Sequence, residues 1–561
     1  MSILPVTCAF ASLIAFEHPL PSMHGGRVGV YGDGENGTYN NVEVALPGLM
    51  TTKDPKLGLM LWELRKSIYG DRRLVFVDGR QLMCSPNWIR DHVHQMKAFR
   101  HWEYDLCSFY DFIVETQRAD GQFFELLKQV DDGHWKLVPD DCYRIYPDDH
   151  QALVRLELEA DIEYLMVEGA LRIWRVTGDD GWLRRTLPRL EKGIDYITSD
   201  PKRWSKELGL VKRMFTIDTW DFVAEPKKPR ERAVEPDSPM SVMHGDNSGV
   251  YKAMADLAWI NDRLGNPEKA GEWRVRAEAL RQAMMKHLWT GSHFMHQLHL
   301  NHSGVDGKER ERLSLSNAYA LNRGVLSRED ARRVIAEYQR RRKTTKCFAE
   351  WFSIDPPYVP AFGCHKAGTY VNGGISPFTA GELALGAFEN GYEEYGYDII
   401  VRLRQMVERD KAVYFLYTPD EAKPLGGGPS GWGSASIMNA IDEGLAGIRD
   451  ADTGYAVIDF SPRWPVTEYA ELRYVTGYES SRKFVDCRYV LTGKGMRYRL
   501  ASPARRVNAH ILLPRGRKVG DVRVNGEGAC GWALENVGES VYVNWSGPAR
   551  DAVDFEILFK E

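Results

Sequence analysis

The sequence predicts a mainly α-helical protein, in which a ring of helical hairpins is followed by a small antiparallel β-sandwich. Apolar residues recur with helical spacing through most of residues 57–449. Short turns alternate there with long connecting segments, as expected of paired helices. From residue 450 the apolar pattern changes to a period of two, which is typical of half-buried strands.

The composition is that of a globular protein and gives no sign of a charged or lipid partner. The chain has 561 residues, 43% hydrophobic and 27% charged, so we expect two or three domains. The net charge of −5 gives no electrostatic reason to expect nucleic acid or an anionic membrane. The apolar stretch 3–16 is too short to span a bilayer and follows no Lys or Arg, so we expect neither a membrane helix nor a secretory signal.

The cysteines and histidines indicate neither a metal site nor a disulfide framework. None of the eight cysteines forms a CxxC pair, and their spacings are irregular. The fifteen histidines show no strong metal-ligand spacing. We therefore expect reduced thiols in a cytoplasmic protein that needs no metal and no other cofactor.

The helical patterns begin after a lead-in, residues 1–56, that is rich in Gly, Asn and Pro and is expected to be irregular or β-rich. The clearest helix is predicted over 153–177 and ends at Gly178, and a second follows over 180–198. One face of the first helix carries Ile162, Leu165, Met166, Gly169 and Ile173. Further helices are predicted at 57–69, 88–102, 105–117, 247–264, 268–289, 312–323, 328–342, 376–390, 393–409 and 432–447.

These helices form pairs, because short turns such as 177–179 and 265–267 join two members of a pair. The longer segments between pairs are 118–150, 199–246, 290–311, 343–375 and 410–431. A ring of hairpins explains this alternation, with the short turns on one rim and the long segments on the other. Loops of this length in a compact protein usually carry function, so we expect the site on the rim of the long segments.

The remaining residues, 450–561, are predicted to form the β-sandwich. Six segments with period-two patterns are separated by Gly, Pro and Asn: RYVLTG, RYRLA, NAHILLP, VGDVRVNG, SVYVNW and DFEILF.

The first candidate site motif is Trp88-Ile-Arg90-Asp91 at the start of a predicted helix. Arg90 and Asp91 suit hydrogen bonds to sugar hydroxyls, and Trp88 suits stacking on a sugar ring. The alternative is a plain helix start, where Asp91 interacts with the helix dipole and Arg90 pairs with an acid elsewhere.

The second motif, Asp218-Thr-Trp220-Asp221, lies inside the long segment 199–246. A carboxyl group beside an indole is partly desolvated, which raises its pKa, and a general acid at neutral pH needs such a raised pKa. The alternative is a loop aspartate bonded to backbone amides, with Trp220 in the core.

Three further segments at predicted helix starts complete the candidate site. Gly245-Asp-Asn247-Ser-Gly enters one helix, and Asn372-Gly-Gly precedes the helix that carries Glu382. The run Gly426-Gly-Gly-Pro-Ser-Gly-Trp432 allows close approach of a backbone to a ligand, or forms a simple hinge. It lacks the GK[ST] ending of a phosphate loop, so we expect no nucleotide there.

Together these motifs resemble the six-hairpin glycosidases, and most closely the trehalase and processing α-glucosidase group. Trp88-Ile-Arg90-Asp91 is similar to the motif that opens their first barrel hairpin, and the glycine run resembles the one ahead of their Phe-Gly-Trp-Thr. Asp218-Thr-Trp220-Asp221 resembles the Gly-Trp-Asp segment of trehalases, which implies that Asp221 is the general acid. The resemblance spans residues 57–447 and implies an (α/α)6 barrel over 57–449 that acts as a glycoside hydrolase.

The catalytic base is where the sequence departs from that family. Trehalases carry a glutamate directly after the glycine run, and Pro429 and Ser430 occupy that interval here. We favour Glu421 as the base. The alternatives are Asp420, Glu382 and Glu443.

The resemblance implies inverting hydrolysis of a disaccharide or oligosaccharide, with water attacking the face opposite the leaving group. The expected substrate contacts are Trp88, Arg90, Asp91, Asp218, Trp220, Asn247, Asn372, Glu382 and Trp432. Three alternatives stay open: a glycoside phosphorylase, a polysaccharide lyase on the same barrel, and a sugar-binding protein without catalysis.

Overall fold

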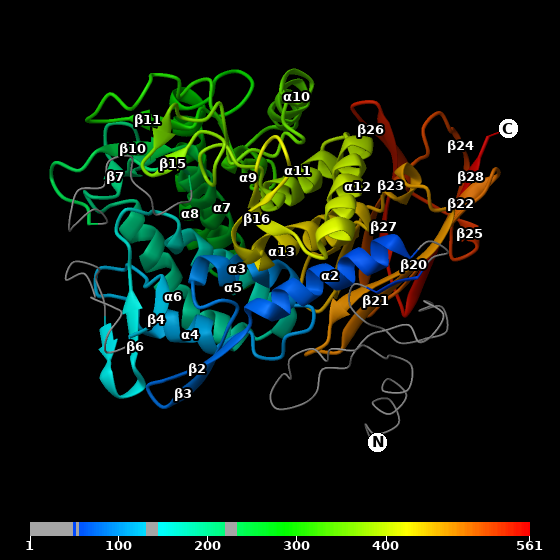
Figure 1. Ribbon diagram of the computed structural model, residues 1–561. Coiled ribbons are helices and arrows are strands. Elements are labelled where there is room, and N and C mark those ends of the chain that lie inside the picture. Colours follow the sequence, from blue (N-terminus) through cyan, green and yellow to red (C-terminus); the bar gives the residue numbers. More distant parts are fainter. Residues whose placement is uncertain (1–48, 52–54, 131–143, 219–232, 561) are drawn as a thin grey trace.

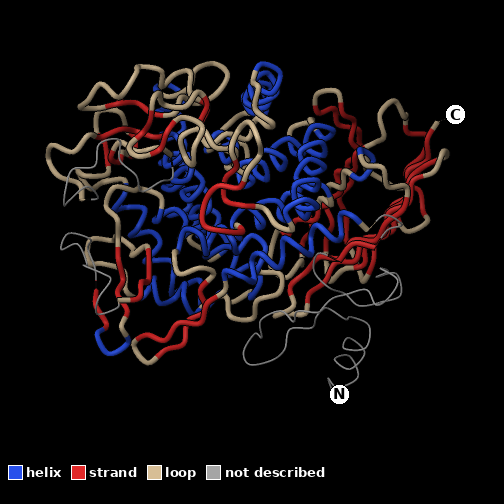
Figure 2. The backbone as a smooth tube through the Cα atoms, viewed as in Figure 1, coloured by secondary structure: helices blue, strands red, loops and turns tan. Residues whose placement is uncertain are grey.

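The computed structural model describes residues 49–51, 55–130, 144–218 and 233–560, which are drawn in colour in Figure 1. Helices occupy the middle of the molecule, and the longest strands gather on one side of them, beside the C-terminus (Figure 2). The lead-in predicted over 1–56 lies largely outside the described residues. No helix in the described part of the chain is long and apolar enough to cross a membrane.

The helical domain contains twelve α-helices within the described ranges. They are α2 (Lys56–Asp71), α3 (Ile89–Phe99), α4 (Ser108–Glu115), α5 (Ile162–Thr177), α6 (Asp180–Ile197), α7 (His244–Arg263), α8 (Pro267–His287), α9 (Ser316–Ala320), α10 (Arg328–Thr344), α11 (Pro377–Glu389), α12 (Glu393–Asp410) and α13 (Gly431–Asn439). A π-helical turn, Ala440–Leu445, continues α13. The predicted helix positions are confirmed with two exceptions: the first nine residues of 153–177 are not helical, and the helix predicted over 312–323 is reduced to Ser316–Ala320, since residues 313–314 form a strand.

Short strands lie in the segments between the helices and form small local sheets. They are β2 (Arg73–Val77), β3 (Arg80–Cys84), β4 (Leu126–Gln129), β5 (Arg144–Tyr146), β6 (Gln151–Val154), β7 (Trp204–Ser205), β8 (Leu210–Val211), β9 (Arg213–Met214), β10 (Met240–Met243), β11 (Gln297–His299), β12 (Leu313–Ser314), β13 (Ile354–Asp355), β14 (Ala361–Phe362), β15 (His365–Lys366), β16 (Tyr414–Tyr417) and β17 (Pro424–Pro429). Strand β6 explains the start of the error, because residues 153 and 154 pair with β4 and β5, and residues 155–161 then form an irregular connection before α5.

The helices pack in the hairpins that the sequence predicts. Short connections join α5 to α6, α7 to α8 and α11 to α12, and the members of each pair pack together. The first members of successive pairs also pack on one another: α3 on α5, α5 on α7, α7 on α9, α9 on α11, and α11 on α13. Helix α13 packs in turn on α3 and on α2, so the last hairpin combines the last and the first helix of the domain.

Two glycines permit close approaches between these helices. A Cβ at Gly249 of α7 would overlap the ring of Tyr164 on α5. A Cβ at Gly381 of α11 would lie 2.5 Å from the backbone carbonyl carbon of Ser436 on α13. Larger side chains at either position would force the helices apart.

The β-rich C-terminal part consists of two sheets. The first has the order β1 (Leu49–Thr51), β20 (Glu471–Tyr478), β21 (Lys483–Leu491), β22 (Gly495–Ala501), β28 (Ala552–Phe559), β24 (Val519–Val524) and β25 (Glu527–Gly528). The second has the order β18 (Ile448–Asp450), β19 (Val457–Phe460), β23 (Arg506–Leu512), β27 (Ser540–Pro548) and β26 (Ala533–Val537). Phe460 of the second sheet packs on Tyr498 and Phe555 of the first, which joins the two sheets face to face.

Two features of these sheets differ from the purely antiparallel prediction for the C-terminal region. Strands β19 and β23 are parallel, because the chain crosses to the other sheet between them. Strand β1 pairs with β20, so residues 49–51 complete a sheet whose other strands all follow residue 470.

Candidate functional site

The N-terminal ends of α5, α7, α9, α11 and α13 each receive one of the long segments, and the short connections leave from their C-terminal ends. Side-chain contacts bring these N-terminal ends together. Gly245 of α7 is the position of closest approach, since a Cβ there would overlap Ser316 of α9 and lie 2.6 Å from Asp218 Oδ1. The loops around β7, β10, β11 and β15 gather beside the same helices in Figure 1. This end of the domain therefore matches the rim on which the sequence analysis expects the site.

Arg90, in the first turn of α3, joins three buried carboxylates. Its Nε donates to Asp161 Oδ2 at 2.6 Å, its Nη2 donates to Glu125 Oε1 at 3.3 Å, and Nη2 also contacts Glu159. Burial opposes ionisation of Asp161, but the Arg90 guanidinium outweighs it and lowers the pKa of that carboxyl. Burial and the adjacent Glu125 carboxylate raise the pKa of Glu159 well above its ordinary value, against the opposing effect of Arg90.

Asp218 is fully buried between α7 and the start of α9. Its Oδ2 accepts hydrogen bonds from Ser314 Oγ at 2.8 Å and from the backbone N–H of Ser316 at 3.3 Å. Burial opposes ionisation, but His244, His296 and the hydrogen bonds from Ser314 and Ser316 stabilise the anion, so the pKa of Asp218 is lowered. Its other oxygen, Oδ1, has no hydrogen-bond partner in the structure.

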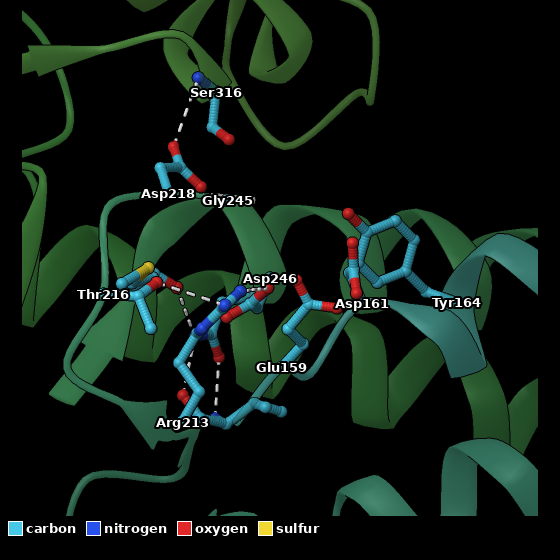
Figure 3. Close-up of polar contacts among 12 residues, drawn as sticks. Glu159, Asp161, Tyr164, Arg213, Thr216, Asp218, Gly245, Asp246 and Ser316 are labelled. Atoms are coloured by element: carbon cyan, nitrogen blue, oxygen red, sulfur yellow. Dashed lines mark hydrogen bonds and ion pairs between the residues drawn. The ribbon is translucent and has the colours of Figure 1, made fainter. Parts of the chain in front are cut away.

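Asp246, in the first turn of α7, lies between Arg213 and the carboxylates of the Arg90 network. Figure 3 shows Asp246, Glu159 and Asp161 side by side, with Arg213 against Asp246. Arg213 Nη1 lies 3.5 Å from Asp246 Oδ1, whereas Asp246 Oδ2 is buried without a partner. Burial, aided by the Asp161 carboxylate and opposed by Arg213, raises the pKa of Asp246 to about 6.

A histidine–glutamate pair, His296 and Glu309, supports the segment that carries Asp218. The backbone N–H of Asp218 donates to His296 Nε2 at 3.3 Å, which leaves the proton of His296 on Nδ1. That Nδ1 lies 2.9 Å from Glu309 Oε2, and Tyr358 Oη donates to Glu309 Oε1 at 2.8 Å. Burial opposes ionisation of Glu309, but hydrogen bonds from His296 and His299, together with Arg312, lower its pKa. The pair thus supports the backbone of Asp218.

Asp91 lies one residue beyond Arg90 and is partly exposed, unlike the carboxylates described above. No other side chain in the described part of the chain donates a hydrogen bond to it. The surrounding protein desolvates the Asp91 carboxyl, and this effect and the Asp71 carboxylate raise its pKa to about 7, whereas Arg90 opposes the rise. Asp71 itself accepts from Gln95 Nε2 at 2.8 Å and from the backbone N–H of Gly431 at 3.2 Å, which links the starts of α3 and α13.

The sequence of residues 87–347 matches the family model of the mannosylglycerate hydrolase MGH1-like glycoside hydrolase domain. This range contains the Arg90 network, Asp91, Asp218 and Asp246.

This part of the chain is therefore similar to a glycoside hydrolase domain, in agreement with the resemblance to six-hairpin glycosidases noted in the sequence.

Solved structures of six-hairpin glycosidases share the fold of this chain at low sequence identity. The α-L-rhamnosidase from Dictyoglumus thermophilum is 12% identical, with a TM-score of 0.58 over 91% of this chain and 50% of that one. The GH78 rhamnosidase of Bacillus sp. GL1 is 14% identical, with a TM-score of 0.55 over 82% and 42%. The GH63 mannosylglycerate hydrolase from Thermus thermophilus is 16% identical, with a TM-score of 0.50 over 68% and 100%. The chain spans about half the length of these rhamnosidases or less, and no curated protein sequence matches it.

Several side chains that the six-hairpin glycosidase motifs single out are engaged by the protein itself. The amide of Asn247 bonds the backbone of Val211 and Met243, and the amide of Asn372 bonds the backbone of Tyr358 and His365. Trp432 is 3% exposed, its ring stacks on His94 and Phe378, and its Nε1 donates to Tyr319 at 2.9 Å. Trp88 remains partly exposed beside β4. The predicted substrate-binding roles of these residues stay predictions.

The proposed glycosidase acids differ in where they lie. Asp221 and Trp220 fall outside the described residues. Glu421 lies in the exposed turn between β16 and β17, where its carboxylate pairs with Lys423. Glu382 bonds Lys97, Asn322 and Ser436 near the opposite ends of the helices, and Glu443 pairs with Arg100 at that same end. Asp246 interacts with both Asp161 of the Arg90 network and Asp218, which relates these predicted residues to one another, and Asp91 adjoins Arg90. Glu421, Glu382 and Glu443 make their contacts elsewhere.

The glycine run of the motif has a local structural role. It forms strand β17, which pairs with β16 through a register shift. Gly426 and Gly428 have φ angles of 98° and 119°, which residues with a side chain rarely adopt, so both positions require glycine.

The sequence analysis missed Glu159, Asp161 and Arg213 as parts of the site. Their signal was the alternation of charged and apolar residues in Arg155-Leu-Glu-Leu-Glu159-Ala-Asp161, which is typical of an extended segment. Assigning this stretch to a helix concealed the fact that its acids converge on Arg90.

Asp246→Asn is expected to weaken the pH dependence of stability. A carboxyl with a pKa of about 6 in the fold and near 3.8 in the unfolded chain is ionised more easily when unfolded, so it destabilises the fold increasingly as pH rises through this interval. The difference corresponds to at most about 3 kcal/mol. Urea unfolding at pH 4 and pH 8 should show the variant gaining stability relative to the parent at pH 8. An unchanged difference between the two pH values would contradict the assignment.

Proposed function

We propose that the protein hydrolyses a glycosidic bond in a disaccharide or oligosaccharide, with inversion at the anomeric carbon. The observation that carries this proposal is the group of carboxylates around Arg90 and Asp218. These residues lie at the helix N-terminal ends that follow the long segments, and within the range that matches a glycoside hydrolase domain. Carboxyl groups whose environments shift their pKa values in opposite directions, as for Asp161 and Glu159, are what acid–base cleavage of an acetal requires.

We propose that the helical domain is a closed (α/α)6 toroid. Helices α3, α5, α7, α9, α11 and α13 would form the inner ring, which is supported by the packing of each on the next and of α13 on α3. The second helices of the hairpins, with α2 completing the last one, would form the outer ring. In such a toroid the N-terminal ends of the inner helices surround one mouth, and the substrate would enter there. The domain limits 57–449 and 450–561 follow from this arrangement.

Asp221 is the proposed general acid that protonates the leaving glycosidic oxygen. It follows Asp218 by three residues, and the hydrogen bonds of Asp218 to Ser314 and Ser316 anchor this segment at the mouth. A second carboxylate then removes a proton from the attacking water. In an inverting enzyme the two carboxyl groups lie about 6.5–9.5 Å apart, which leaves room for that water.

Two residues are proposed for the base, on different grounds. Glu421 is the nearest acid to the family's motif position, although its carboxylate pairs with Lys423 in an exposed turn. Asp91 is supported by its position at the mouth, its partial exposure, the lack of a side-chain donor in the described residues, and a pKa of about 7. A base with a pKa near the working pH is the most effective kind.

Azide distinguishes the two candidate bases. In the variant that lacks the true base, azide needs no deprotonation and should restore turnover by attacking the anomeric carbon, which yields a glycosyl azide. We expect this rescue in Asp91→Asn or in Glu421→Gln, but not in both. Rescue of neither variant would remove both residues from this role.

The stereochemistry of the product tests the proposed reaction directly. The relatives named for mannosylglycerate and α-L-rhamnosides suggest the first substrates to screen, together with aryl glycosides and disaccharides. ¹H NMR during turnover should show the anomer opposite to that of the substrate first, with the other appearing later by mutarotation. Initial release of the same anomer would contradict inversion, and phosphate-dependent turnover would indicate a phosphorylase instead.

We also propose a cytoplasmic location. Six cysteines in the described part of the chain are free thiols, as expected in a reducing compartment.

A further inference from the structure

A second cavity, of about 500 Å³, lies among the helices at the ends opposite to the candidate active site. It is lined by the later turns of α3 and α5, by α7 and α11, and by the residues that follow α9 and α13. None of the motifs that indicated the glycosidase contributes to it except Glu382. Its volume lies within the range of small-molecule sites, at about 300–1,000 Å³.

Cationic side chains outnumber carboxylates in this cavity. Its described lining contains eight Lys or Arg residues and five Asp or Glu residues. Arg328 at the rim pairs with Glu535 of β26 at 2.8 Å, outside the cavity, which leaves seven cations facing five carboxylates. An excess of buried positive charge is costly unless an anion compensates it.

The carboxylates that are present are shared among several cations. Glu168 on α5 binds Arg172 at 3.1 Å, and burial of its carboxyl is outweighed by Arg172, Arg323, Lys97 and Lys252, which together lower its pKa. Glu443 likewise pairs with both Arg100 at 2.6 Å and Arg449 at 3.3 Å. The other three carboxylates each pair with one of the same cations, Glu382 with Lys97, Asp256 with Lys252 and Glu389 with Arg449, so five carboxylates are shared among seven cations.

Arg172 and Arg175 lie one helical turn apart on α5 and both line this cavity. Burial, reinforced by repulsion from Arg100 and opposed by Glu168, lowers the pKa of the Arg172 guanidinium. Arg175 Nε is buried and donates no hydrogen bond. Arg175 is in the last turn of α5, where the helix dipole favours a cation, but that field supplies no acceptor for this N–H.

A neutral group in the lining is also unsatisfied. Asn322 donates from Nδ2 to the backbone oxygen and to Oε2 of Glu382, each at 2.9 Å, while its Oδ1 is buried without a partner. Within the described residues, the cavity lining therefore contains an amide oxygen, that of Asn322, and a guanidinium N–H, that of Arg175, without partners, while Arg172 donates to the Val93 backbone oxygen and to Glu168. Such a lining suits a ligand with both an anionic group and a hydroxyl group.

We propose that this cavity binds a small dianionic phosphate group, held mainly by Arg172 and Arg175, with Asn322 accepting from a hydroxyl of the ligand. Guanidinium groups bind phosphate oxygens through paired, charge-assisted hydrogen bonds. One dianion cancels the excess of two positive charges. The site is separate from the Arg90 network, so the proposal does not depend on the proposed hydrolysis.

Calorimetric titration of the full chain with inorganic phosphate, at constant ionic strength maintained with chloride, tests this site. We expect one saturable site, and at least tenfold weaker binding in Arg172→Met and in Arg175→Met. The matched control is Arg328→Met, which removes a cation from the same rim whose partner is Glu535, and which should change the affinity less than twofold. Absence of saturable binding, or equal affinity in all three variants, would overturn the proposal.

Two further measurements guard against misfolded variants and identify the ligand. Phosphate should raise the melting temperature of the parent but not that of Arg172→Met/Arg175→Met, whose circular dichroism should match the parent. Glycerol phosphate that binds more tightly than inorganic phosphate would indicate an ester, provided that Asn322→Leu abolishes the difference, and equal affinity would indicate free phosphate. Tighter binding of malonate than of either phosphate would contradict the phosphate assignment.

Discussion

Asp221→Asn is expected to lower the turnover of glycosides with poor leaving groups by about 10²–10⁴-fold, because an amide cannot deliver a proton to the departing oxygen. The loss should shrink for a 2,4-dinitrophenyl glycoside, whose leaving group departs without protonation. Steady-state kinetics on a series of aryl glycosides with graded leaving-group pKa values measures this dependence.

The base variants provide the matched comparison for this experiment. Asp91→Asn and Glu421→Gln change the attack of water, so whichever removes the base should slow good and poor leaving groups alike. Asp218→Asn is the structural control within the same motif, because its hydrogen bonds from Ser314 and Ser316 predict a loss of stability without a change in leaving-group dependence. An Asp221→Asn variant with equal losses across the series would eliminate its role as the acid.

Arg90→Met is expected to lower the free energy of unfolding by about 3–5 kcal/mol, the range for removing one partner of a buried ionic network. Methionine fills a similar volume but leaves Asp161, Glu125 and Glu159 buried without their guanidinium. Urea unfolding at pH 7, followed by tryptophan fluorescence, measures the loss.

Two variants make that result specific to the buried charge. Arg80→Met breaks the exposed pair with Glu115, whose side chains are 48% and 52% exposed, and should cost less than about 1 kcal/mol. Adding Asp161→Asn to Arg90→Met should recover part of the lost stability, because it removes one of the buried carboxylates that Arg90→Met leaves unpaired. A loss in Arg90→Met no larger than in Arg80→Met would show that water already reaches the network.

The helical hairpins could be predicted because their signals are local. Gly178 adopts a φ of 66° at the end of α5, and the Asp179 side chain caps α6 by accepting from the Trp182 N–H at 2.8 Å. Both residues act on neighbours within a few positions, so one stretch of sequence carries the whole signal. Strand β6 and the parallel pair β19–β23 depend on partners far away in the chain, and no local pattern distinguishes them.

The site was only partly predictable for the same reason. Arg90 and Asp91 stood out at a helix start, but the acids that engage Arg90 lie 35–71 positions away in the sequence. The sequence therefore indicated the residue types of the site without their partners. It also did not distinguish an amide that contacts a ligand from one, such as Asn247, that bonds the protein's own backbone.

The pairing of the first helix with the last sets a demand on synthesis of the chain. The buried face of α2, formed by Leu57, Met60, Leu61, Leu64 and Ile68, packs against α12 and α13, and Asp71 bonds Gly431 across 360 residues. A ribosome adding about 5–20 residues per second needs roughly 20–70 s to cover that distance. Throughout that interval the apolar face of α2 is exposed on the nascent chain. We therefore expect the yield of folded protein in the cell to depend on chaperones that bind such apolar surfaces until α13 has been translated.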